Sequence, residues 1–159
     1  MTHPETTDDD LEELIARVRK ATGALMQGDV RRYLALVGPA HDYTLMPPTG
    51  GPTRHGFDSS AASIEALESF FAGEGDGDFE LDQSYTAGNL VVLVGVERQR
   101  GSVDGLPDQD WSLRVTLVFR REGSGWQLAH RHADALVHAI GMEQLSALAR
   151  GSGLPDKKE

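Results

Sequence analysis

Hydrophobic and polar residues follow a helical period in the first half of this chain. Residues 11–26 carry apolar side chains at steps of three and four, behind an acidic run at 8–10 that suits the N-terminus of a helix. Glycine, proline and capping residues mark the ends of two further helices, expected at 30–37 and 60–71. A last short helix is expected near 142–149.

The second half of the chain follows the period of strands. After a short strand at 43–46, residues 90–96 form a continuous apolar run, typical of a strand covered on both faces. Apolar and polar residues then alternate over 111–120 and again over 126–134. Helices followed by a meander of strands predict an α+β domain, in which helices cover one face of a curved antiparallel sheet.

The last predicted strand carries the most distinctive polar residues. Under strict alternation one face of it holds five side chains: Trp126, Leu128, His130, His132 and Asp134. Pairing Phe119 with Trp126 sets the register and places the even-numbered residues of 90–96 on the same inner face. An apolar wall that ends in two imidazoles and a carboxylate suits a ligand pocket.

The opposite face of the predicted sheet is mixed in character. It would hold Glu97, Arg114 and Arg131 among small apolar residues, and Glu97 could pair with Arg114 across it. Such a face could form the interface between two subunits.

The predicted pocket has residues suited to acid–base catalysis. His130 or His132 could move a proton, Asp134 could orient the imidazole, and Tyr43 could stabilise an enolate oxygen. This set predicts a cofactor-free isomerisation, dehydration or cyclisation of a carbonyl substrate. The same histidines could instead be hydrogen-bonded structural residues. A His-x-His pair can also bind a metal, but the sequence offers no closed ligand set, so we assign no metal.

A second group of residues could contact a ligand: Trp111, Tyr33, Arg54, His55 and Asp58. The stiff Pro-rich loop at 47–52 precedes Arg54, which could hold an anionic group of the ligand. The alternatives are that the loop charges are solvated at a rim and that the aromatic residues belong to the core.

Charge and composition argue against nucleic-acid binding and against a membrane-spanning or secreted protein. The formal net charge is −10, from 15 basic and 25 acidic residues, and such a surface repels nucleic acid. The chain has no cysteine, no visible signal peptide and no apolar run as long as a membrane helix, so we expect a cytoplasmic protein. We expect one domain over residues 8–150, with a disordered tail at 1–7 and a flexible tail at 151–159.

Two segments and the order of elements resemble the SnoaL-like group of the nuclear-transport-factor-2-like superfamily, which includes ketosteroid isomerases. The segments are Leu-Met-Pro-Pro-Thr-Gly-Gly at 45–51, leading to His-Gly-Phe-Asp at 55–58, and Gly-Trp-Gln-Leu-Ala-His-Arg-His-Ala-Asp at 125–134. The resemblance implies a conical fold with a pocket between helices and sheet, and a homodimer formed through the outer face. It does not supply a catalytic residue here.

Two functions therefore remain open. One is the binding of a small apolar or carbonyl-bearing molecule, with or without acid–base chemistry. The other is a non-enzymatic dimeric binding or interaction module.

Overall fold

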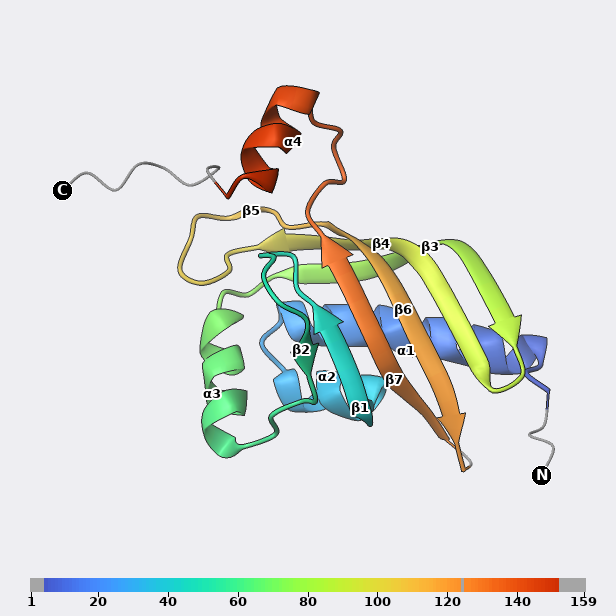
Figure 1. Cartoon of the computed structure of the whole chain (residues 1–159). Helices are drawn as coiled ribbons and strands as arrows, with labels where there is room; N and C mark the ends of the chain where they lie inside the picture. Colours follow the sequence, from blue (N-terminus) through green and yellow to red (C-terminus); the bar gives the residue numbers. More distant parts are fainter. Residues whose placement is uncertain (1–4, 124, 152–159) are drawn as a thin grey trace.

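The computed structural model describes residues 5–123 and 125–151, and the chain folds as helices on a curved sheet (Figure 1). The helices are α1 (Asp8–Met26), α2 (Val30–Val37), α3 (Ala61–Phe70) and α4 (Met142–Ala149). The predicted tails at 1–7 and 151–159 fall mostly outside the described residues. Within the described part, no helix is long and apolar enough to cross a bilayer.

The strands form one seven-stranded sheet. They are β1 (Pro39–Met46), β2 (Arg54–His55), β3 (Asp76–Ala87), β4 (Leu90–Gly101), β5 (Gln109–Asp110), β6 (Leu113–Glu122) and β7 (Gly125–Asp134). Their order is β2-β1-β7-β6-β4-β3, and β5 pairs with β4. The predicted α+β class is confirmed, but the sheet is mixed rather than wholly antiparallel, because β1 runs parallel to β7.

Local capping explains where the helices begin and end. Thr7 and Asp10 form a reciprocal capping box at the start of α1. The side chains of Asp29 and Ser60 accept hydrogen bonds from the first turns of α2 and α3. Gly38 ends α2 with a φ of 53°, a left-handed conformation that glycine adopts without strain. Thus the chain turns directly from α2 into β1.

The core lies between α1 and the concave face of the sheet. Leu14 and Val18 of α1 are buried together with Phe79, Leu93 and Leu117 from three strands. α1 and α2 run behind the sheet, and α3 stands beside β2 (Figure 1). The helices therefore cover one face of the sheet and leave the other face open.

The odd-numbered residues of β4 face the core, so the predicted inner face of this strand is wrong. Val91 and Leu93 are fully buried, whereas Val92 and Val94 lie half-buried on the open face. A strand that is apolar on both sides carries no alternation, so its pattern could not select a face.

β7 contains a bulge at Ala129 that changes the direction of the side chains after it. Phe119 of β6 pairs with Leu128, whereas the next residue back, Val118, pairs with His130. Ala129 therefore has no partner on β6, and the alternation reverses beyond it. The predicted register of Phe119 with Trp126 is wrong, because Trp126 pairs with Arg121.

Candidate functional site

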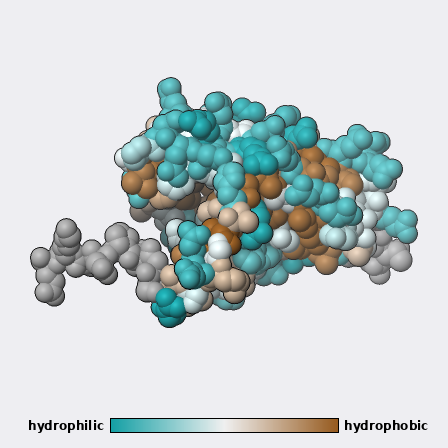
Figure 2. Space-filling model, turned by 90° about the horizontal axis from the view of Figure 1, so that it is seen from above, coloured by the Kyte–Doolittle hydropathy of each residue, from teal (hydrophilic) through white to brown (hydrophobic). Residues whose placement is uncertain are grey.

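A pocket with a cavity volume of about 500 Å³ opens between α2, α3, β1 and the concave face of the sheet. Its lining is mainly apolar and includes Leu34, Leu45, Phe57, Leu67, Phe70 and Leu128. Seen from the end that carries α4, the surface is mainly hydrophilic, and hydrophobic side chains gather in separate patches (Figure 2). A cavity of this size and lining suits a small organic molecule.

Three residues form an ion-paired cluster at the floor of the pocket. Arg131 donates from both terminal nitrogens to the two carboxylate oxygens of Glu97, with Nη2 2.8 Å from Oε2. Gln99 donates its side-chain amide to the same Oε2 at 3.1 Å. Arg131 is 8% exposed, Glu97 4% and Gln99 5%. Burial, the largest single effect, lowers the pKa of Arg131, but the charge and hydrogen bonds of Glu97 together with the effects of Tyr33 and Tyr43 outweigh it, and the pKa of Arg131 is raised.

Two tyrosines complete the polar part of the pocket. Burial raises the pKa of Tyr33, and burial, with a smaller effect of Tyr33, raises the pKa of Tyr43. Both phenols therefore stay protonated at neutral and mildly alkaline pH. Among the described residues, neither hydroxyl has a hydrogen-bond partner, so both can donate to a molecule in the pocket.

The inward orientation predicted for His130, His132 and Asp134 is wrong. Beyond the bulge, Arg131 and Ala133 point into the core, and the two histidines and Asp134 take the open face. Thr44 Oγ1 lies 2.8 Å from Nδ1 of His130. Of the four residues predicted to be catalytic, which are these three and Tyr43, only Tyr43 lines the pocket.

Asp134 is held by an ion pair on the open face. Arg114 donates to its two carboxylate oxygens at 2.9 and 2.8 Å, and the hydrogen bond from Arg114 lowers the pKa of Asp134. Arg114 thus pairs with Asp134, and not with Glu97 as predicted. His132 is exposed in a shallow groove that Arg114 and Asp134 also line.

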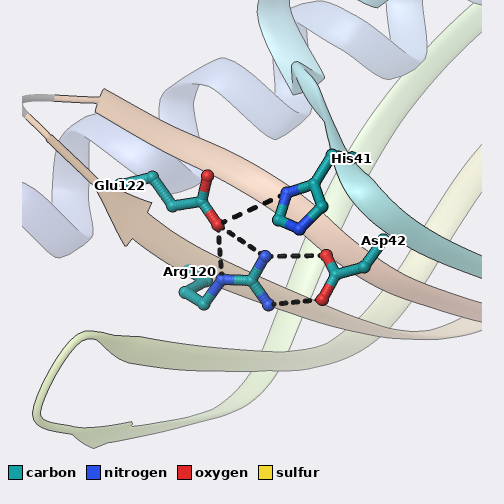
Figure 3. A network of polar contacts seen from close by, with 4 residues as sticks. All are labelled: His41, Asp42, Arg120 and Glu122. Atoms are coloured by element: carbon teal, nitrogen blue, oxygen red, sulfur yellow. Dashed lines mark hydrogen bonds and ion pairs between the residues drawn. The ribbon is translucent and has the colours of Figure 1, made fainter.

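A second polar network lies further along the open face (Figure 3). Arg120 of β6 donates to both oxygens of Asp42 on β1, at 3.1 and 2.7 Å, and it also donates to Glu122. His41 lies 3.9 Å from Glu122. Because β7 lies between β1 and β6, Arg120 ties together strands that are not neighbours.

Of the other residues predicted to bind a ligand, some line the pocket and the rest lie outside it. Tyr33 and Arg54 line the pocket with Tyr43. His55 pairs with Thr44 in the β1–β2 ladder and thus shares the open face of the sheet. Asp58 accepts a hydrogen bond from the backbone of Ser60 at the start of α3.

The side chain of Trp111 contacts the backbone at the end of β4 and does not line the pocket. Its indole donates to the carbonyl of Gly101 at 3.0 Å. The Trp111 ring is not part of the pocket lining. Phe70 is part of this lining, but its ring does not fill the cavity.

The sequence interpretation missed Arg131, Glu97 and Gln99 as site residues. Glu97 and Gln99 follow an apolar strand at a spacing of two, which was a usable sign that both share one face. Arg131 was assigned to the open face because strict alternation allowed no bulge. The available signal for a buried pair was that Glu97 and Arg131 carry opposite charges within strands that are otherwise largely apolar; in the folded chain these strands, β4 and β7, lie on either side of β6.

Among the described residues, no histidine, aspartate or glutamate lines the pocket, and no three such side chains come together as a metal site. Glu97 lies behind Arg131 and is held by it. The arrangement can therefore surround an apolar molecule and donate hydrogen bonds to it, but its lining presents no free base.

The model of the SnoaL-like domain matches residues 15–137. The chain belongs to this family. Similar folds occur in an NTF2-like protein with a cystatin-like fold from Novosphingobium aromaticivorans, with 18% identity and a TM-score of 0.61, covering 91% of this chain and 88% of that chain. No curated protein matches this SnoaL-like chain.

Two further structures show how varied the proteins with this fold are. The CaMKII hub homology domain of Chlamydomonas reinhardtii is 16% identical, with a TM-score of 0.58, and covers 78% of this chain and 96% of that chain. A presumed ketosteroid isomerase from Shewanella frigidimarina is 18% identical, with a TM-score of 0.53, and covers 70% of this chain and 86% of that chain. At these identities the likeness extends to the fold alone.

Proposed function

We propose that this SnoaL-like protein binds a small, mainly apolar molecule that carries a hydrogen-bond acceptor such as a carbonyl group. The observation that carries the proposal is a largely apolar pocket of about 500 Å³ with two unpartnered phenols, Tyr33 and Tyr43. The apolar wall supplies most of the binding free energy, and the phenols orient the acceptor.

Binding is favoured over acid–base catalysis because the pocket has donors but no proton acceptor of suitable basicity. Tyr33 and Tyr43 could polarise a carbonyl, as in an oxyanion hole. An isomerase or dehydratase also needs a base within reach of the substrate. The histidines that were predicted to supply it, His130 and His132, face the open side of the sheet.

A fluorescent probe tests the pocket directly. N-phenyl-1-naphthylamine is neutral and apolar, and its emission should rise when it enters the pocket. The variant Ala66→Trp places a large ring in the pocket lining and should weaken probe binding at least about tenfold, because it removes space from the cavity. Ala61→Trp on the same helix lies outside the lining and serves as the matched control.

Displacement of the probe then tests the polar end. Decan-2-one should bind about fivefold more weakly to each of Tyr33→Phe and Tyr43→Phe, since each substitution removes one hydrogen bond of about 1 kcal/mol. Probe binding that is equal in the wild type, Ala66→Trp and Ala61→Trp would refute the proposal.

We also infer that two copies associate through the open face of the sheet. Val92, Val94 and Val118 are half-buried there, and Tyr85 is 59% exposed on the adjoining strand. Apolar side chains on an uncovered sheet face lose contact with water when a second copy covers them. This face also supports the second candidate function, a dimeric interaction module.

Light scattering after gel filtration measures the association. The wild type should have the mass of a dimer, and Val94→Glu should have the mass of a monomer, because it buries a charge at the contact. Leu106→Glu, at an exposed loop position, should remain dimeric. A monomeric wild type, or a dimeric Val94→Glu variant, would contradict the inference.

A further inference from the structure

We infer that the natural ligand is a carboxylate, whose charged group lies beside Arg54 at the mouth of the pocket while its apolar body lies inside. The inference rests on the proposed function, since it names the class of molecule that the same pocket takes. Three observations carry it: the direction of Arg54, its lack of an acidic partner, and the neutralised floor of the pocket.

The β1–β2 ladder directs Arg54 toward the pocket. Arg54 pairs with Leu45, and residues that are directly opposite in an antiparallel ladder place their side chains on the same face. Leu45 lines the pocket, and so does Arg54. The backbone N–H of Gly56 donates to the carbonyl of Tyr43 at 2.7 Å and continues this pairing beyond β2. The backbone of β2 thus fixes the face of the sheet from which the exposed Arg54 side chain extends, at the edge of the pocket.

Arg54 is a cation without a partner. Among the described residues, none of the ion pairs or side-chain hydrogen bonds includes it, whereas six other arginines, at 98, 100, 114, 120, 121 and 131, each contact a carboxylate within 3.4 Å. The acid closest to it in sequence, Asp58, accepts a hydrogen bond from the start of α3 instead. In a chain with a net charge of −10, an arginine on a pocket lining with no acidic partner is available to an anionic ligand.

The floor of the pocket is a poorer site for the carboxylate of the ligand than Arg54 at the mouth. Both terminal nitrogens of Arg131 already donate to Glu97, so a second carboxylate there would lie close to a buried negative charge. The tyrosine hydroxyls near that floor suit a neutral acceptor. The ligand is therefore oriented with its carboxylate outward at Arg54 and its apolar body inward.

Competition between a carboxylate and its ester tests this orientation. Decanoate and methyl decanoate share one hydrocarbon chain and differ in charge, and both can displace N-phenyl-1-naphthylamine. At low salt, decanoate should compete about two- to fivefold better than the ester in the wild type, a range set by an exposed ion pair. The preference should shrink as salt is added, because the pair is accessible to solvent.

Two arginine substitutions make the test specific. Arg54→Gln should bring the ratio of the two competitors to about one, with each displacement corrected for the affinity of this variant for the probe. Arg32→Gln removes the same charge from an exposed position on α2 that is outside the pocket lining, and it should keep the wild-type ratio. Equal competition in the wild type, or an unchanged ratio in Arg54→Gln, overturns this inference alone. Failure of the probe to bind overturns the proposed function and this inference with it.

Discussion

Arg131→Met should lower the free energy of unfolding by about 3–5 kcal/mol, because it leaves the carboxylate of Glu97 buried without its counterion. Glu97 is 4% exposed, and apart from Arg131 only the amide of Gln99 is bonded to it among the described side chains. Urea unfolding followed by tryptophan fluorescence measures the loss. A loss below about 1 kcal/mol would show that the pair is not desolvated in the folded protein.

The double variant Glu97→Leu/Arg131→Met separates the orphaned charge from the loss of packing. Replacing both members of a buried ion pair by apolar residues is often close to neutral. We expect the double variant to lose much less stability than Arg131→Met alone. The amide of Gln99 then loses its acceptor, which leaves a residual cost of about 1–3 kcal/mol.

Deletion of Ala129 should also destabilise the protein by at least about 3 kcal/mol. Without the extra residue, β7 must either turn Arg131 out of the core or shift its pairing with β6. The first outcome leaves Glu97 unpaired, and the second displaces Trp126 and Leu128 from their buried places. Both outcomes also disrupt the floor of the pocket, so binding of N-phenyl-1-naphthylamine should be lost or strongly reduced.

Ala129→Gly is the control for this deletion. It keeps the number of residues in the bulge and removes only one methyl group, so a loss of about 1 kcal/mol or less is expected. Urea unfolding of both variants decides the question. Similar stabilities of the deletion variant and the wild type would mean that the bulge does not set the direction of the residues after it.

The site was only partly predictable, because some of its residues are placed by local sequence signals and others by a bulge that forms only in the folded sheet. Tyr33 and Tyr43 lie on elements that local signals mark, and Arg54 was expected in the loop that follows the Pro-rich segment; all three line the pocket. Arg131 and the histidines on either side of it depend on the bulge at Ala129, which no turn residue marks in the sequence. Because of this one extra residue, Arg131 faces the pocket and His130 and His132 face the open side of the sheet.

The amino-acid sequence by itself determined the elements and their class. Capping residues, glycines and apolar periodicity are local, and they define α1, α2, α3 and the longer strands of an α+β domain, whereas the two-residue strands β2 and β5 were not predicted from them. Only the tertiary structure decided which face of β4 and of the end of β7 is buried. That choice depends on packing against α1 and on the pairing of Glu97 with Arg131, residues 34 positions apart, and these contacts exist only in the folded chain.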